Sequence, residues 1–260
     1  MLLNKEQIQL LANRLTMARI IGKPIPALSY QYEFSMDDAY EIQGILAKEK
    51  IKNGDKIIGW KLGYTSLAMR KQMKIDEPNF GSLHQSMFLK SGFILPDNLI
   101  QPKVEPEIAV KFKYPLSGRV TFEEVYNAIE SAHGCLEIVD SIYEDYKFKI
   151  EDNTADGSSA AQFVIGPEIE KNELDKTEVK FFKNGDIIDQ CLGSSASGHP
   201  LNGVVWLVNC LDKLQAKIEP GEIVITGGLT SAIDIKKGDH VYGIFDNTVK
   251  VEVFGWIKNE

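Results

Sequence analysis

Near the middle of the chain the sequence runs KVEPEIAVKF, residues 103–112. Side chains alternate between the two faces of a β-strand, so a strand here would place Glu105 and Glu107 together, opposite the apolar residues. Two neighbouring carboxylates repel, and one is expected to take up a proton unless a cation lies between them. A solvated strand face is the alternative interpretation, because charged side chains are mostly exposed. Pro106 also argues against a central strand, since it cannot donate to the ladder.

A third glutamate, Glu137, lies in the apolar segment CLEIVD, residues 135–140. Burying an acidic side chain in a hydrophobic strand is costly unless it is paired or bound to a metal. Three converging carboxylates would suit Mg²⁺ or Mn²⁺, which prefer oxygen ligands and keep water positions open for substrate. The histidines are isolated and the cysteines form no CxxC pair, so a zinc site is not indicated.

Lys61 lies between two glycines in the segment GWKLG, residues 59–63. The glycines leave space beside a strand and allow a close approach to its backbone. One interpretation is a surface lysine on an edge strand. The other is a partly desolvated ammonium group that binds a substrate carboxylate or moves protons. The residues alone leave both interpretations open.

Two loop segments carry weaker signals. Residues 156–159 (DGSS) form a turn by composition, and they could equally supply an acid and a hydroxyl group to a site. Residues 226–228 (TGG) end an apolar strand, where their backbone N–H groups could bind a carboxylate or simply form a turn. Residues 156–159 do not fit a P-loop, and no GxGxxG motif follows a strand, so nucleotide binding is not supported.

The composition of the 260-residue chain is that of a globular protein, with 43% hydrophobic and 25% charged residues. The formal charge of −8 contains no block of like charges, which argues against nucleic-acid binding. No apolar run approaches the roughly 20 residues of a membrane span. The N-terminal segment carries charges inside its apolar stretch and is typical of an amphipathic helix, not a signal peptide. We therefore expect a soluble cytoplasmic protein without membrane contact.

Periodicity and capping residues predict the secondary structure. Helices are predicted over residues 5–21 and from Ser35, where Asp38 completes a capping box. Thr121 with Glu124 caps a helix through Ile129, and Pro200 starts another. Segments rich in Val, Ile and aromatic residues predict strands, and Asn184-Gly185 predicts a hairpin turn. The predicted strands are residues 57–64, 103–112, 135–140, 161–166, 179–188, 221–228 and 240–245.

These elements do not alternate as regular βαβ units. They predict an α+β fold in which a helical N-terminal region, residues 1–55, packs on a mixed, curved sheet formed by residues 56–260. No linker rich in Gly, Ser or Pro separates the two regions. The boundary is therefore soft, and the whole chain could form one domain.

Six ordered segments resemble the 2-keto-4-pentenoate hydratase / 4-oxalocrotonate decarboxylase family, within the fumarylacetoacetase superfamily. They extend over nearly the whole chain, from about residue 5 to the end. They are GWKLGYTS (59–66), EPNFG (77–81), PKVEPEIA (102–109), LEIVDS (136–141), DGSS (156–159) and GHPL (198–201).

The resemblance implies a barrel-like mixed sheet with helices packed around it. It implies a divalent ion held by Glu105, Glu107 and Glu137, an active-site Lys61, and a role in the meta-cleavage breakdown of catechols. One departure is clear. The family usually has Asp-Asn-x-Ser where this chain has DGSS at 156–159, so any role of that asparagine is lost or supplied elsewhere.

The pattern is closer to the decarboxylases of the family than to its hydratases. The hydratases usually carry Asp directly before the Phe-Gly and Glu-Ala-Glu on the metal strand, whereas this chain has Asn79 and Glu105-Pro106-Glu107. Residues 226–230 and 140–144 also resemble the decarboxylases. The resemblance therefore implies decarboxylation of 2-oxo-3-hexenedioate (4-oxalocrotonate) to 2-hydroxypenta-2,4-dienoate and CO₂. Hydration of 2-hydroxypenta-2,4-dienoate is the alternative reaction.

Decarboxylation requires an electron sink, which a Mg²⁺ or Mn²⁺ ion provides by polarising the 2-oxo group. Lys61 would orient the substrate or stabilise charge and later transfer a proton. Asp156, Ser159 and Thr226 are candidates for substrate contact, and no organic cofactor is needed. The expected partners are a small 2-oxo dicarboxylic acid, further copies of the chain in a homo-oligomer, and a sister hydratase, because family members associate. A non-catalytic scaffold for such a hydratase is an alternative of another class.

Overall fold

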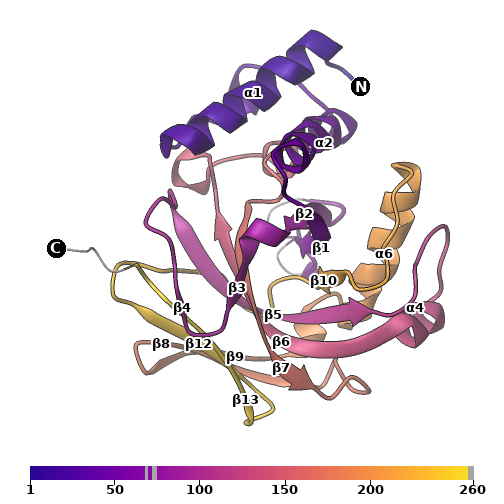
Figure 1. Cartoon of the computed structure of the whole chain (residues 1–260), viewed down its shortest axis with the longest axis vertical. Coiled ribbons are helices and arrows are strands. Elements are labelled where there is room, and N and C mark those ends of the chain that lie inside the picture. The colour runs from indigo at the N-terminus through magenta and orange to yellow at the C-terminus, as the bar shows by residue number, and fades with distance from the viewer. Residues whose placement is uncertain (68–69, 72–74, 257–260) are drawn as a thin grey trace.

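The structure, a computed structural model, describes residues 1–67, 70–71 and 75–256. The other positions of the predicted region 56–260 lie outside the described residues. A helical N-terminal region lies above a curved main sheet, and a smaller second sheet packs on the other side of that sheet (Figure 1). The predicted α+β class with a mixed, barrel-like sheet is confirmed.

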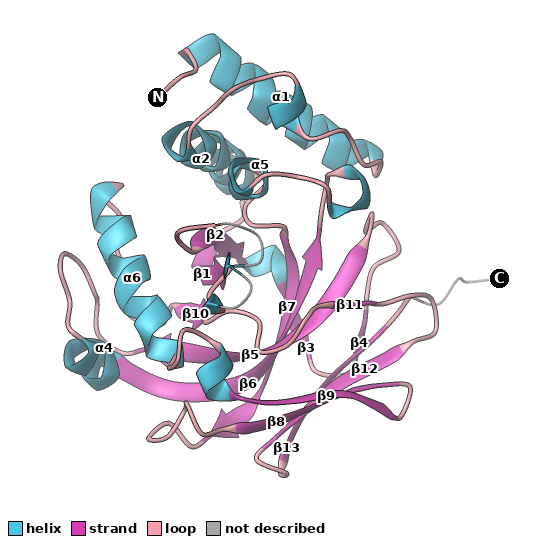
Figure 2. Cartoon of the chain, turned by 180° about the vertical axis from the view of Figure 1, so that it is seen from behind, coloured by secondary structure: helices cyan, strands magenta, loops and turns pink. Residues whose placement is uncertain are grey.

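The helices begin where their capping residues predict. Asn4 caps α1, Ser35 caps α2 and Thr121 caps α4, each with a complete capping box. Pro200 is the first residue of the last helix. Seen from behind, α5 lies next to α2 (Figure 2). The α-helices of the described residues are α1 (Lys5–Ile21), α2 (Met36–Lys52), α4 (Phe122–Ala128), α5 (Ile150–Ala155) and α6 (Pro200–Lys213), and the 3-10 helices are Leu28–Tyr30, Gln85–Met87, Glu144–Tyr146 and Gly193–Ser195.

The main sheet is mixed, with the strand order β2-β1-β10-β5-β6-β7-β3. The pairs β1–β10 and β3–β7 are parallel, and the others on this path are antiparallel. A short strand, β11, also pairs with β5. The strands are β1 (Ile57–Gly63), β2 (Asn79–His84), β3 (Phe88–Lys90), β5 (Pro102–Phe112), β6 (Ile129–Asp140), β7 (Ala160–Ile169), β10 (Ile223–Ile225) and β11 (Ile233–Asp234).

The second sheet has the order β4-β13-β12-β8-β9. The predicted hairpin joins β8 to β9, and Asn184 and Gly185 both have the positive φ that a tight hairpin turn requires. The strands are β4 (Phe93–Ile94), β8 (Glu178–Lys183), β9 (Asp186–Leu192), β12 (His240–Phe245) and β13 (Val249–Phe254). None of the helices in the described part of the chain combines the length and hydropathy that a membrane span requires.

Strand β5 is central although it contains Pro106. The carbonyl of Pro106 accepts a hydrogen bond from the Leu229 N–H at 3.0 Å. The backbone N and C=O of one strand residue point to the same side, so the proline nitrogen points toward Leu229 and away from β6. On that side β10 pairs only with residues 109–111 and β11 only with 103–104. The proline therefore costs no ladder hydrogen bond, and the expectation that it argues against a central strand is wrong.

The two faces of β5 meet different surroundings. One face contributes to a core that the main sheet, the second sheet and α6 share, through Val104, Ile108, Val110 and Phe112. The other face carries Glu105 and Glu107, followed by Ala109, which packs with Cys135 and Phe163. Strand alternation thus places both glutamates inside the concave side of the main sheet.

Candidate metal centre and substrate cavity

Three glutamates converge on the concave side of the main sheet. Glu105 on β5 lies directly opposite Glu137 on β6 in the strand register, and Glu107 is the next residue of β5 on the same face. One carboxylate oxygen from each lies within 4.8 Å of the others. Glu107 and Glu137 are fully buried and Glu105 is half-buried. This burial excludes a solvated strand face for Glu107 and Glu137.

Burial and the neighbouring carboxylates oppose the ionisation of Glu105 and Glu107. Burial, reinforced by the charge of Glu137, raises the pKa of Glu105 from 4.5 to about 7. Burial together with the charges of Glu137 and Glu105 raises the pKa of Glu107 well above its usual value. A cation among the three groups would reverse this effect, because it stabilises the charged form of each carboxylate.

The hydrogen bonds of these carboxylates fit a bound divalent cation. Glu107 Oε2 accepts a 2.6 Å hydrogen bond from the Gly227 N–H. The buried Oε1 atoms of Glu107 and Glu137 have no hydrogen-bond partner among the described residues. Buried charged oxygens without partners are costly, and Mg²⁺ or Mn²⁺ takes such oxygens as ligands. A Cβ at Gly228 would lie 2.1 Å from Glu105 Oε2, so a glycine at 228 leaves the space that this carboxylate occupies.

Lys61 lies beside Glu137 in the interior of the sheet. Its strand, β1, is flanked by β2 and β10, and its side chain is 3% exposed, so the interpretation as a surface lysine on an edge strand is wrong. Lys61 Nζ lies 3.0 Å from Glu137 Oε2 and donates to the Ser158 carbonyl at 3.0 Å. Burial alone would lower the pKa of Lys61, but the charges of the three nearby glutamates outweigh it and raise this pKa. The group is therefore an ammonium ion.

The turn that contacts Lys61 has an unusual backbone. Gly157, Ser158 and Ser159 have φ values of 70°, 58° and 55°, so three successive residues are left-handed. This conformation costs a non-glycine residue about 1–2 kcal/mol, and such strain is typical of functional sites. The turn directs the carbonyl and hydroxyl oxygens of Ser158 at Lys61 Nζ. Gly and Asn both tolerate the left-handed region, so the backbone at 157 suits Gly157 and would also suit the asparagine that the resemblance leads us to expect.

A buried network of amide side chains supports this turn. Asn79 donates to Asn153 Oδ1 and to Thr154 Oγ1, each at 2.9 Å, and accepts from the Ser158 hydroxyl at 3.0 Å. A Cβ at Gly63 would lie 2.3 Å from Asn79 Oδ1. The space that Gly63 leaves is thus filled by the Asn79–Ser158 contact. Asn153 was not among the residues predicted from the sequence, and its only signal was a polar residue before the turn.

A cavity of about 240 Å³ opens beside Lys61 and Glu105. Its volume suits a small molecule. Ser159 lines it and accepts a hydrogen bond from Asn153 Nδ2 at 2.9 Å. The wall also includes aromatic side chains and a second cation, namely Tyr64, Tyr146, Phe148 and Lys103.

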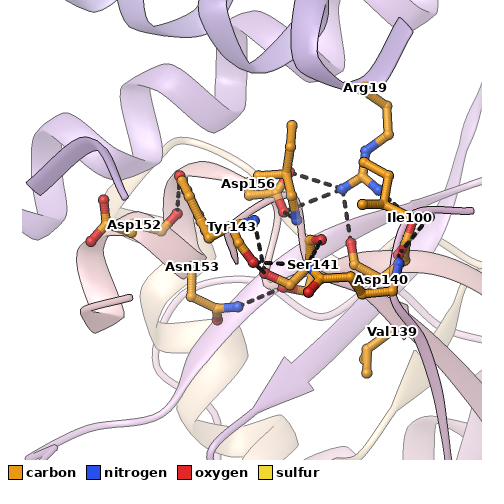
Figure 3. Close-up of polar contacts among 12 residues, drawn as sticks. Arg19, Ile100, Val139, Asp140, Ser141, Tyr143, Asp152, Asn153 and Asp156 are labelled. Carbon is orange, nitrogen blue, oxygen red and sulfur yellow. Dashed lines mark hydrogen bonds and ion pairs between the residues drawn. The ribbon is translucent and has the colours of Figure 1, made fainter. Parts of the chain in front are cut away.

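Two of the predicted substrate contacts lie elsewhere. Asp156 does not line this cavity, because its carboxylate accepts from Arg19 at 3.2 Å and from the Ile142 N–H at 3.3 Å (Figure 3). Arg19 on α1 also donates to Asp140 at 2.7 Å. Asp156 thus belongs to the contact between the N-terminal helices and the sheet. Thr226 is fully buried and its hydroxyl donates to the Ile108 carbonyl at 2.9 Å, so its neighbour Gly227 supplies the N–H near the glutamates.

Known proteins resemble the chain along almost its whole length. The 4-oxalocrotonate decarboxylase of Pseudomonas putida is 33% identical over 245 residues, which cover 92% of this chain and 93% of the relative. The 2-keto-4-pentenoate hydratase of Paraburkholderia xenovorans is 33% identical over 243 residues, which cover 90% of each chain. No protein-family model matches the chain.

A solved structure resembles the chain along its whole fold. The 4-oxalocrotonate decarboxylase from Pseudomonas putida G7, complexed with magnesium and adipate, superposes with a TM-score of 0.94 at 30% sequence identity. The match covers 98% of this chain and 99% of that protein. The chain therefore shares its fold with the solved decarboxylase and about a third of its aligned residues with these enzymes.

Proposed function

Since the chain belongs to the 2-keto-4-pentenoate hydratase / 4-oxalocrotonate decarboxylase family, within the fumarylacetoacetase superfamily, we propose that it is a metal-dependent lyase. Its proposed reaction is the decarboxylation of 2-oxo-3-hexenedioate to 2-hydroxypenta-2,4-dienoate and CO₂. The observation that carries this proposal is the meeting of Glu105, Glu107 and Glu137 beside the Lys61 ammonium, at the wall of a small cavity.

The three glutamates would hold Mg²⁺ or Mn²⁺. The two buried oxygens without partners support this assignment, as does the magnesium complex of the similar decarboxylase. When bound, the ion supplies the Lewis acidity that polarises the 2-oxo group of the substrate. Gly227 holds the Glu107 carboxylate in place through its N–H, and Lys61 neutralises part of the charge on Glu137.

Lys61 is the proposed proton donor. In the reaction the C5–C6 bond breaks, C6 leaves as CO₂, and the electron pair moves through the conjugated chain to the C2 oxygen. That oxygen takes up a proton, and the buried ammonium of Lys61 faces the cavity where the oxygen would lie. Ser158 and Glu137 fix the direction of this ammonium from two sides. The Ser159 hydroxyl is a further proposed contact to the substrate.

Hydration of 2-hydroxypenta-2,4-dienoate is the second candidate function. It is supported by curated hydratases that are as similar to the chain as the decarboxylases are, at 33% identity. Such an enzyme would add water to the dienoate and release no CO₂ from any substrate. The residue at position 79 favours the decarboxylase, because Asn79 stands where the hydratases usually carry an aspartate.

Measuring CO₂ from 2-oxo-3-hexenedioate with the purified chain and Mg²⁺ separates these functions. A decarboxylase releases CO₂ and forms the dienoate in equal amounts. Consumption of added dienoate without any CO₂ release would instead identify a hydratase. We also propose a homo-oligomer and an association with a sister hydratase. If the isolated chain turned over neither substrate, a non-catalytic scaffold role would replace the proposed enzyme.

A further inference from the structure

The proposed substrate carries two carboxylates, and the metal centre accounts for only one of them. Among the described residues that line the cavity, two carry a positive charge, Lys61 and Lys103. Lys61 is committed to Glu137 and to Ser158. Lys103 therefore stands out as the cation without a role in the proposed chemistry.

Lys103 lies on the same strand face as the glutamates. It precedes Glu105 by two residues on β5, so the two side chains project to the same side of the sheet about 6.6 Å apart along the strand. Its side chain is 29% exposed, in contrast to the buried Lys61. The cavity thus runs from a buried end at Lys61 toward a more exposed end at Lys103.

The Lys103 ammonium makes two described contacts. Its Nζ donates to Asp234 Oδ1 at 2.6 Å, and Asp234 lies on β11, which pairs with β5 beside Lys103. The same Nζ lies 5.0 Å from the centre of the Tyr146 ring, within the range of a cation–π contact. An ammonium group has three N–H donors, and the bond to Asp234 uses one of them.

Tyr146 is itself held rigidly. Its hydroxyl donates to the Gln101 carbonyl at 2.8 Å and accepts from the Ser141 N–H at 3.3 Å. Asp145 and Tyr146 both have positive φ, 54° and 57°, and the Gln101 side chain accepts from the Asp145 N–H at 3.1 Å. Strained backbone that several hydrogen bonds maintain is typical of functional sites.

We propose that Lys103 is the specificity-determining residue that binds the distal carboxylate of a six-carbon dicarboxylic acid. This inference rests on the proposed function, because it places the other carboxylate at the glutamate and Lys61 end. The five carbon–carbon bonds of such an acid, each about 1.5 Å, extend over about 6 Å. That length matches the step of about 6.6 Å from Glu105 to Lys103 along the strand. Asp234 neutralises part of the Lys103 charge. The proposed role of the ammonium is therefore mainly to orient the distal carboxylate.

The test compares a dicarboxylic with a monocarboxylic acid. Calorimetry on the Mg²⁺-loaded protein measures the affinities for adipate and for pentanoate. In Lys103→Met the affinity for adipate should fall about tenfold to a hundredfold, as for a lost hydrogen bond between charged groups. The affinity for pentanoate should change by less than about twofold, and Lys103→Arg should recover most of the adipate affinity because it restores the charge.

Lys111→Met is the matched control. Lys111 lies on the same face of β5, but it pairs with Glu130 at 3.0 Å and does not line the cavity. Its substitution should leave both affinities unchanged. Equal losses for adipate and pentanoate in Lys103→Met, or no loss of adipate affinity, would overturn the inference.

The CO₂ assay separates this inference from the proposed function. If the wild-type chain releases no CO₂ but Lys103→Met still loses adipate selectively, the decarboxylase proposal fails and the dicarboxylate site stands. If the wild-type chain releases CO₂ and Lys103→Met keeps both its adipate affinity and its kcat/KM, the role of Lys103 alone fails.

Discussion

Glu105 and Glu137 face each other directly across the ladder between β5 and β6. Like charges in directly opposed positions destabilise a sheet. Here the opposition is compensated on one side by the Lys61 ammonium, 3.0 Å from Glu137. The remaining repulsion favours a second cation between the carboxylates.

Glu107→Gln should weaken Mn²⁺ binding at least tenfold while the protein remains folded. The amide keeps the size of the side chain and can still accept from the Gly227 N–H, but it lacks the charge that attracts a hard cation. Calorimetry gives the affinity and circular dichroism the fold. Glu130→Gln, a half-exposed residue of β6 paired with Lys111, is the control and should bind Mn²⁺ normally. Unchanged binding in Glu107→Gln would remove this residue from the ligand set.

The metal-free protein should lose stability as the pH rises from about 4.5 to about 7. These limits are the ordinary pKa of a glutamate and the raised pKa of Glu105 in the folded protein. A folded state with the higher pKa binds more protons there than the unfolded chain, so the free energy of unfolding falls with rising pH. Melting temperatures with EDTA and with Mg²⁺ at pH 5 and pH 8 test this. Mg²⁺ should stabilise the protein more at pH 8, and equal stabilisation at both pH values contradicts the expectation.

Lys61→Met should reduce turnover about 10²- to 10⁴-fold, the range for losing a general acid. Mn²⁺ affinity should be retained or increase, because the variant removes the ammonium that neutralises Glu137. Steady-state kinetics and Mn²⁺ calorimetry on the same preparation separate the two effects. A variant that binds Mn²⁺ and keeps wild-type turnover would exclude Lys61 as the proton donor.

Gly157→Asn should be tolerated and Gly157→Val should not. The φ of 70° at this position suits Gly and Asn, whereas a β-branched residue there is strained. We expect a loss below about 0.5 kcal/mol for Asn and of about 1–2 kcal/mol for Val in the free energy of unfolding, measured by urea denaturation. A Cβ at 157 meets nothing within 4 Å, so side-chain clashes do not confuse the comparison. Equal losses for both variants would show that φ is not the cause.

Arg19→Met should destabilise the protein by about 1–3 kcal/mol, because it removes charged hydrogen bonds to two carboxylates. Without Arg19, buried Asp140 keeps its bonds from the N–H groups of Ile100 and Gln101, so the fold should survive. Arg14→Met on the same helix removes only an exposed contact to Gln31 and should cost less than about 0.5 kcal/mol. Thermal melts of both variants measure the two losses of stability, and a loss in Arg19→Met no larger than that in Arg14→Met would contradict the prediction.

Local sequence patterns predicted the helix starts and several of the strands. Capping residues such as Ser35 and Thr121 placed the helix starts, because the side chain and the backbone it binds are neighbours in sequence. Strand alternation put Glu105 and Glu107 on one face for the same reason. Strand β2, which sequence reasoning missed, lacks such a signal. Residues 79–84 (NFGSLH) contain a glycine and polar residues, yet all six are buried.

The candidate site shows the limit of this reasoning more clearly. The embedded position of Glu137 predicted burial, but only the strand register brings it opposite Glu105. Asp156 and Ser159 belong to one turn, yet they point to different sides of it, one toward Arg19 and the other into the cavity. Three successive left-handed residues turn the two side chains to different sides, and the residue types in DGSS do not predict that backbone conformation.

The contacts of Arg19 also bear on how the chain folds during synthesis. Its two carboxylate partners follow it by 121 and 137 residues, so α1 leaves the ribosome long before either exists. Until then its apolar side, including Ile8, Leu11 and Leu15, is covered only by α2 and by the segment before it, which contributes Leu28 and Phe34. Contacts of such separation slow folding. Helix α1 would thus be among the last elements to reach its final position, and a nascent chain cut before residue 156 should bind chaperones through this side.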